Sequence, residues 1–212
     1  MITEHNPKRI KDQLNMNWLT VLEKVADEVY KAVNPLLGTV EARETVGIGA
    51  SGDTTRRIDA LAEEVIIRYL DENGVSCILI GEECGKREIG RNPEAYLVVD
   101  SIDGTTNASR GIPYSAISIA VSDKPKLSGV FAGIVLNVFT GEKFAAERGC
   151  GAYRGKTRIR TSKVKELKDA VVSMDLSKRA FYMEWALQIA RRVSGVRHLG
   201  SASIELSYVA MG

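Results

Sequence analysis

Apolar residues recur every three or four positions in two stretches near the start of the chain, which is the spacing of amphipathic helices. The first helix is expected over residues 18–36 and the second over 58–69, with Thr54 or Thr55 as the N-cap of the second. The glycine-rich run 47–53 lies between them and predicts a loop without regular structure.

From residue 77 onward the pattern changes to short continuous apolar runs, which are typical of buried strands. The first two runs, 77–80 and 96–99, are bounded by polar clusters, and a short loop is expected over 86–93. Helices ahead of a strand-rich middle, followed by alternating strands and helices, indicate a layered α/β (α+β) architecture. Further strands are expected over 114–121, 128–137, 142–146, 151–153 and 170–174, and further helices over 180–193 and 201–211.

The composition narrows the class of protein without indicating a function. The chain has 212 residues, with 29 Lys and Arg against 27 Asp and Glu. This nearly balanced charge indicates neither a nucleic acid nor a membrane surface as a partner. Its three cysteines are odd in number and widely spaced, which argues against a disulfide framework. No apolar run approaches the roughly 20 residues of a membrane span, and no signal-peptide core precedes the first helix. We therefore expect a soluble, cytoplasmic protein.

Acidic residues follow two of the expected strands. Glu82 comes after the run 77–80, and Asp100 and Asp103 come after the run 96–99. If the two strands are neighbours, these carboxylates meet at one edge of the sheet, where α/β proteins bind ligands. At ~4 Å and an effective dielectric constant of about 20, each pair of carboxylates costs about 4 kcal/mol, so either some of them are protonated or a cation is bound. Hard oxygen ligands favour Mg²⁺, with Mn²⁺ as an alternative, over Zn²⁺.

The segment after Asp103 adds a second kind of chemistry. Gly104 allows a sharp turn, and the amides that open the next helical turn can then bind an anion. Asp59, in the first turns of the second helix, could accept a hydrogen bond from the Thr105 hydroxyl, and a Thr polarised in this way could activate water. Taken singly, Asp-Gly-Thr is more typical of a tight turn and Asp59 of an exposed helix face. The combination with acids at two strand ends favours a catalytic site.

These segments resemble the inositol monophosphatase superfamily. The run LVVDSIDGTTNASRGIPYSAIS at 97–118 is similar to its signature D-x-I-D-G-T-x-N, and IGEECG at 80–85 is similar to its upstream acidic motif. GASGDTTRRIDALAE at 49–63 and GSASIELSYVAMG at 200–212 resemble its glycine-rich loop with the following helix and the segment beyond its substrate pocket. The combination looks most like archaeal enzymes that hydrolyse both inositol monophosphate and fructose 1,6-bisphosphate.

The resemblance implies a layered αβαβα sugar-phosphatase fold and a two-metal site. Glu82, Asp100 and Asp103 would ligate Mg²⁺ together with the backbone carbonyl of Ile102, and Asp100 would bridge two ions. The reaction implied is in-line attack of water on phosphorus. A homodimer is typical of the family, and the expected partner is a small phosphate ester.

The same resemblance assigns the remaining site residues. Thr105, paired with Asp59, would activate the attacking water, and the amides of Gly104 and Thr105 would hold the phosphate. The residues that would line the sugar pocket are Gly200, Ser201 and Ala202.

One departure concerns the family's later signature, W-D-x-A-A-G or a close variant, whose Asp completes the second metal site. No such segment occurs before Gly212, and we expect the chain to be a fragment. Residues 1–140 are expected to form an N-terminal α+β lobe with the metal and phosphate site. Residues 141–212 would then begin an incomplete C-terminal α/β lobe.

Three other interpretations compete with this one. The haloacid-dehalogenase class needs a nucleophilic Asp two positions before Asp103, and Ser101 stands there instead. A 3′(2′),5′-bisphosphate nucleotidase of the same superfamily remains an alternative, since specificity lies in pocket loops. A non-catalytic metal- or phosphate-binding relative also remains open, although it would not need to keep the whole constellation.

Overall fold

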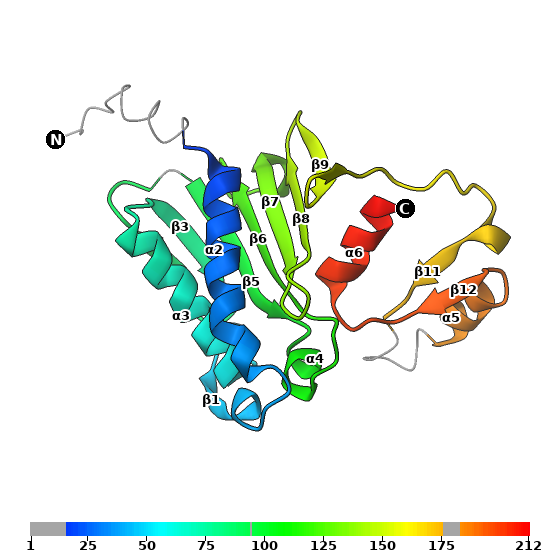
Figure 1. Cartoon of the computed structure of the whole chain (residues 1–212), viewed down its shortest axis with the longest axis horizontal. Helices are drawn as coiled ribbons and strands as arrows, with labels where there is room; N and C mark the ends of the chain where they lie inside the picture. The colour runs from blue at the N-terminus through cyan, green and yellow to red at the C-terminus, as the bar shows by residue number, and fades with distance from the viewer. Residues whose placement is uncertain (1–15, 94, 176–182) are drawn as a thin grey trace.

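The computed structural model describes residues 16–93, 95–175 and 183–212, and its centre is a mixed sheet (Figure 1). Within these residues the sheet has eight strands in the order β10-β9-β8-β7-β6-β5-β3-β4. All neighbours are antiparallel except β3 and β5, which are parallel. The strands are β3 (Cys77–Gly81), β4 (Gly85–Ile89), β5 (Ala95–Asp103), β6 (Ala116–Ser122), β7 (Val130–Asn137), β8 (Lys143–Glu147), β9 (Gly151–Arg154) and β10 (Thr157–Arg158).

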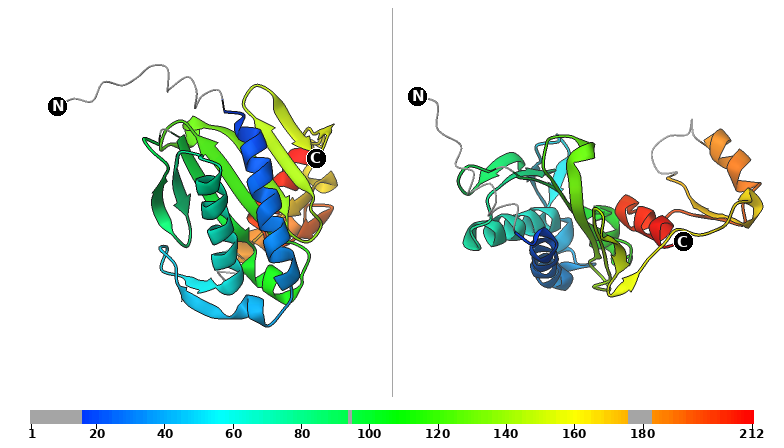
Figure 2. Two further views of the ribbon diagram at one scale, coloured as in Figure 1. Left: turned by 60° about the vertical axis from the view of Figure 1, so that its left-hand side comes forward. Right: turned by 90° about the horizontal axis from the view of Figure 1, so that it is seen from above.

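Two long helices, α2 (Trp18–Val33) and α3 (Arg57–Glu72), cover one face of this sheet (Figures 1 and 2). Leu22 and Val25 of α2 and Ile66 of α3 are fully buried, and they pack in one core with alternate residues of β6 such as Ile117 and Ile119. The spacing of three and four in the helices and of two in the strand thus brings all these side chains to the same interface.

The opposite face of the sheet carries α6 (Ala202–Met211) (Figure 2). Leu206 and Ala210 of α6, with Ala120 and Val135 of the sheet, line a cavity of about 750 Å³ between the two. A smaller unit made of β11 (Val171–Ser173), α5 (Met183–Ala190) and β12 (Gly195–Arg197) lies beside the main sheet (Figure 1). β11 and β12 pair in parallel.

The N-terminal connection departs from the expected irregular loop. Residues Thr45–Ile48 form β1 and Thr54–Arg56 form β2, which pair as an antiparallel hairpin across the glycine-rich turn. The loop prediction is confirmed for 49–53, but 47–48 belong to β1, and the prediction of a threonine N-cap for the second helix is wrong. α3 begins after β2, and its N-cap is Arg56. The side chains of β1 are all exposed, so no alternation of apolar residues marked it as a strand.

Other differences are smaller. The segment expected as a loop over 86–93 contains most of β4, which is polar because it forms the edge of the sheet. α2 ends at Val33, and the following residues form a short 3₁₀ turn. The helix expected over 180–193 is seen as α5, while residues 180–182 lie outside the described part. Short 3₁₀ turns lie at Asn34–Leu36, Glu41–Arg43, Leu127–Gly129 and Leu167–Asp169.

The prediction that the strands containing 77–80 and 96–99 are neighbours is confirmed by the parallel pairing of β3 and β5. The division into lobes 1–140 and 141–212 stays a prediction, and β8 and β9 pair onto β7 in the same sheet. In the described residues, no helix combines the length and apolar character needed to cross a bilayer.

Candidate active site

The candidate site lies where β3 and β5 end side by side. Glu82 directly follows β3, and Asp100 and Asp103 lie near the end of β5. The pairing of β5 with β6 is irregular between Asp100 and Asp103, because three steps on β5 match two steps on β6. Such a bulge re-aims side chains, here at the end of the strand where the acids lie.

Gly104 connects β5 to the short helix α4 (Thr105–Arg110). Its φ of 86° lies in the left-handed region. A Cβ at this position would lie 2.9 Å from the carbonyl oxygen of Gly200 and 3.0 Å from that of Tyr114. The turn therefore requires glycine for both its conformation and its close packing, as the sequence predicts.

Thr105 and Asp59 form the hydrogen bond that the sequence suggests. The Thr105 hydroxyl lies 3.0 Å from Asp59 Oδ1 and also 3.0 Å from the carbonyl oxygen of Ile102. Asp59 is buried, and its Oδ2 accepts a hydrogen bond from the amide of Arg56 at 3.2 Å. Burial raises the pKa of Asp59 to about 7, although these two hydrogen bonds oppose the rise. A carboxylate tuned near neutral pH is suited to exchanging a proton.

Asp100 lies in a strongly negative environment. Burial, together with the charges of Asp103, Glu82 and Asp59, raises the pKa of Asp100 to about 7. Among the described residues, the groups that shift the pKa of Asp100 include no basic side chain. The end of β5 thus concentrates negative charge without an internal counter-ion for Asp100.

Asp103 faces the start of α6. Its Oδ2 accepts hydrogen bonds from the Ser201 hydroxyl at 2.8 Å and from the Ser203 amide at 2.6 Å, and the Ser203 hydroxyl contacts the same atom. The sequence analysis included Ser201 but missed Ser203. A serine three residues past a glycine carries no pattern of its own, so only the fold reveals this contact.

The oxygen atoms of this site can be compared with the ligands that Mg²⁺, the ion suggested by the sequence, prefers. The donors are carboxylates and a backbone carbonyl, which are the ligands that Mg²⁺ prefers, and the negative charge at Asp100 calls for a cation. As placed, however, no three acidic, histidine or cysteine side chains of the described residues are gathered closely enough to hold an ion together. The donor chemistry fits Mg²⁺, and ligation requires Glu82, Asp100 and Asp103 to turn toward a common point.

The residues expected to line the sugar pocket lie at the start of α6. Ser201 is its buried N-cap, while Gly200 and Ala202 are exposed beside it. Asn107 of α4 ties this segment down, because its Nδ2 donates to the carbonyl oxygens of Leu199 and Tyr114, both at 2.7 Å. Asn107 stands in the D-x-I-D-G-T-x-N motif, yet the sequence analysis gave it no role.

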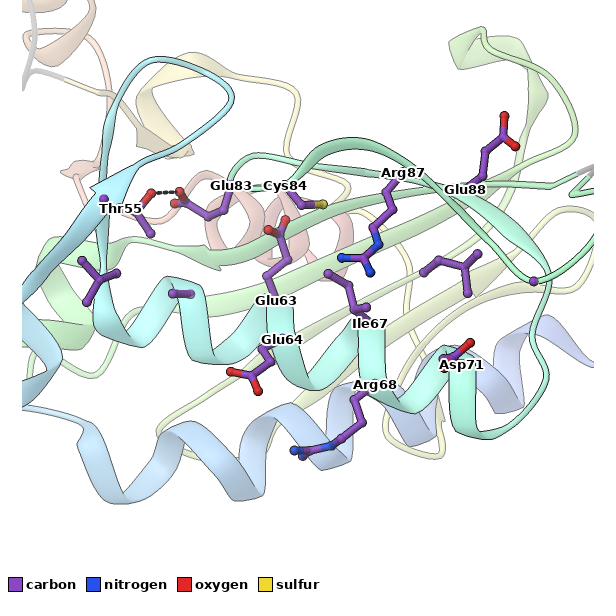
Figure 3. Close-up of a pocket in the computed structure, with 15 residues that line it drawn as sticks. Thr55, Glu63, Glu64, Ile67, Arg68, Asp71, Glu83, Cys84, Arg87 and Glu88 are labelled. Atoms are coloured by element: carbon purple, nitrogen blue, oxygen red, sulfur yellow. Dashed lines mark hydrogen bonds between the residues drawn. The ribbon is translucent and has the colours of Figure 1, made fainter.

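A second cavity of about 690 Å³ lies behind the turn between β3 and β4 (Figure 3). Glu63 extends from α3 toward Glu83 and Cys84, and Glu83 accepts a hydrogen bond from the Thr55 hydroxyl (Figure 3). Burial raises the pKa of Glu63, and its Oε1 has no hydrogen-bond partner in the described part of the chain. Two buried or half-buried carboxylates thus support the turn that carries Glu82.

Comparisons with known proteins agree with these features. The model of the inositol monophosphatase family matches residues 15–212. A fructose-1,6-bisphosphatase/inositol-1-monophosphatase of Methanothermobacter thermautotrophicus is 35% identical over 204 residues, which cover 92% of this chain and 72% of that protein. A bifunctional NADP phosphatase/NAD kinase of Methanococcus maripaludis is 33% identical over 220 residues, covering 93% of this chain and 38% of that protein.

The fold agrees as well. The structure is similar to an IMPase from Thermotoga maritima with a TM-score of 0.79 and 26% identity, covering 93% of this chain and 74% of that one. The mixed α/β sugar-phosphatase fold expected from the sequence is therefore confirmed. This chain belongs to the inositol monophosphatase family.

Proposed function

We propose that this chain hydrolyses phosphate monoesters with the help of Mg²⁺, and that inositol monophosphate and fructose 1,6-bisphosphate are its substrates. The observation that carries the proposal is the hydrogen bond between Thr105 and Asp59, set beside the acidic end of β5. The M. thermautotrophicus relative carries both activities in its name. The family is generally Mg²⁺-dependent.

Glu82, Asp100 and Asp103 would hold the metal with the carbonyl oxygen of Ile102. Bound there, Mg²⁺ would polarise the phosphate ester and lower the pKa of the attacking water. Burial among like charges makes the ionised form of Asp100 costly, and a bound cation would offset this cost.

Thr105 and Asp59 would prepare the attacking water. Thr105 Oγ1 would accept a hydrogen bond from the water, while its own proton stays directed at Asp59 Oδ1, 3.0 Å away. Asp59 would act in its ionised form, so that the threonine oxygen gains basicity as the water loses its proton. The Ile102 carbonyl, also 3.0 Å from Oγ1, limits the rotation of the hydroxyl.

The amides of Gly104 and Thr105 would bind the phosphate oxygens. They open α4, and the first N–H groups of a helix have no partner within the helix. Gly200, Ser201 and Ala202 would face the alcohol part of the substrate. Asn107 supports this arrangement, because it links α4 to the segment before α6.

The substrate is tested with the purified protein in Mg²⁺. We expect kcat/KM for inositol 1-phosphate and fructose 1,6-bisphosphate to exceed that for 3′-phosphoadenosine 5′-phosphate. Higher kcat/KM for the nucleotide would replace the sugar-phosphatase proposal by the nucleotidase one. Hydrolysis of none of the three by folded protein would support a non-catalytic relative.

We also propose that the protein works as a cytoplasmic homodimer. The support is the family resemblance and the free cysteines Cys77, Cys84 and Cys150. Sedimentation equilibrium distinguishes a dimer from the 23.2 kDa monomer.

A further inference from the structure

A third cavity, of about 430 Å³, opens beside Asp59 and Thr105. Its lining does not include Asp103 or the residues at the start of α6. The cavity therefore adjoins the Thr105–Asp59 pair and shares no lining residue with the expected sugar pocket.

The lining of this cavity contains both acidic and basic side chains. Glu82, Glu83, Asp53 and Asp59 contribute carboxylates, whereas the cationic lining residues are Arg43, Arg56 and Arg110. The three arginines come from the 3₁₀ turn before β1, from β2 and from the end of α4. The fold thus brings together three guanidinium groups from distant parts of the sequence, which we call the arginine rim.

Two members of the arginine rim are held by hydrogen bonds to backbone carbonyl oxygens and, for Arg56, also to the hydroxyl of Thr45. Arg43 Nε donates to the carbonyl oxygen of Ser109 at 2.8 Å. Arg56 Nη1 donates to the carbonyl oxygen of Arg43 and to Thr45 Oγ1, both at 3.0 Å. Each contact occupies one guanidinium nitrogen, so further N–H groups of both arginines remain for a ligand.

No member of the arginine rim forms a salt bridge with a carboxylate of the described residues. The neighbouring Arg57 differs, since its Nε lies 2.9 Å from Glu41 Oε1, and it does not line the cavity. Unpaired guanidinium groups around one cavity attract an anion, and their planar N–H pairs match the oxygens of phosphate.

We propose that Arg43, Arg56 and Arg110 form a second phosphate-binding site beside the reaction centre. The inference rests on the proposed function, in which the reacting phosphate lies beside Thr105 and Asp59. Inorganic phosphate formed in this reaction would separate from the alcohol and contact the arginine rim. The second phosphate of a bisphosphate substrate has the same chemistry and is the other possible source.

Direct binding tests the site without catalysis. In EDTA, inorganic phosphate is titrated into the wild-type protein and into Arg110→Gln by isothermal calorimetry. Arg110 is exposed and makes no side-chain hydrogen bond or ion pair with the described residues, so we expect its replacement to leave the fold intact. We expect the dissociation constant for phosphate to rise ~tenfold, the effect of losing a charge-assisted contact.

Two matched variants distinguish phosphate binding at this site from a general effect of positive charge. Arg57→Gln removes the same charge from a neighbouring arginine outside the cavity, and it should leave phosphate binding within about twofold. Arg110→Lys keeps the charge but loses the planar donor pair, so its affinity should fall between wild type and Arg110→Gln. Equal affinity in wild type and Arg110→Gln, or equal loss in Arg57→Gln, would overturn the proposal.

Kinetics with Mg²⁺ then identify the source of the phosphate. If the rim receives the product, Arg110→Gln raises the inhibition constant of inorganic phosphate during inositol 1-phosphate hydrolysis. If it receives a second substrate phosphate, the same variant raises KM for fructose 1,6-bisphosphate but not for inositol 1-phosphate. Because the calorimetry needs no turnover, an inactive protein that binds phosphate through Arg110 would contradict the proposed function alone.

Discussion

The hydroxyl of Thr105 and the carboxylate of Asp59 lie 3.0 Å apart, although 46 positions separate them in the sequence. The pair joins the first turn of α3 to the first residue of α4. Together with the hydrogen bond from Ser101 to the Asp59 carbonyl oxygen, it links the helical layer to the region at the acidic end of β5, and it is the basis of the proposed chemistry.

Replacing Thr105 by Ala should slow turnover with little change in substrate affinity. The hydroxyl acts on water, whereas the amide proposed to bind phosphate remains. We expect kcat to fall by about 10²-fold or more, the usual contribution of a positioned proton acceptor, and KM to change by less than about threefold. Thr105→Ser, which keeps the hydroxyl, should recover much of the loss. A collapse of affinity with normal kcat would contradict the role given to Thr105.

Replacing Asp103 by Asn should remove hydrolysis while the fold persists. The amide can still accept hydrogen bonds from Ser201 and Ser203, but it no longer supplies a negative ligand. We expect kcat/KM to fall by more than about 10²-fold, with an unchanged circular dichroism spectrum. An active variant would remove Asp103 from the proposed metal site.

The stability of the metal-free protein should depend on pH through the acids of the site. The pKa values of Asp59 and Asp100 rise from 3.8 to about 7 on folding. Between about pH 4 and 7 both groups are then protonated when folded and ionised when unfolded, so the free energy of unfolding falls as pH rises. We expect Tm in EDTA to decline over this range.

Asp100→Asn provides the control for this pH effect, because it removes one of the two groups. Its Tm should decline less steeply with pH than that of the wild-type protein in EDTA. Added Mg²⁺ should raise Tm more at pH 8 than at pH 5, since the cation competes with protons for the site. Parallel pH profiles for the two proteins would contradict the assignment of this effect to Asp100.

Gly104 should not tolerate a side chain. At φ 86°, Gly104→Ala would place its Cβ 2.9 Å from the Gly200 carbonyl oxygen, and we expect a loss of about 3 kcal/mol of stability from strain and overlap. Gly74 is the matched control, with φ 65° and no atom within 4 Å of an added Cβ, and Gly74→Ala should cost only about 1 kcal/mol. Urea unfolding of the two variants measures the difference, and equal losses would argue against the close approach at Gly104.

Much of the site could be predicted because its signals are local. The apolar runs that form β3 and β5 are continuous, as strands buried between layers are, and the acids stand directly at their ends. The Asp59–Thr105 contact could be suggested because the two segments carry unusual polar residues at element boundaries.

The elements and contacts that the sequence did not predict have no local sequence pattern. β1 is exposed along its whole length, so its residues show no period of two, and the hairpin forms because the chain must fold back into α3. Ser203 is an ordinary helix residue until α6 meets Asp103. The arginine rim is assembled from β2, α4 and a 3₁₀ turn, and no single window of sequence contains it.

The central claim is that this protein is a Mg²⁺-dependent phosphomonoesterase whose metal is held by the acids at the ends of β3 and β5. The most direct measurement is phosphate release from fructose 1,6-bisphosphate and inositol 1-phosphate as Mg²⁺ is titrated into EDTA-treated protein. We predict release that begins only with added Mg²⁺ and is lost in Asp103→Asn. Release in EDTA, or an equal Mg²⁺ response in the wild-type protein and Asp103→Asn, would contradict the account.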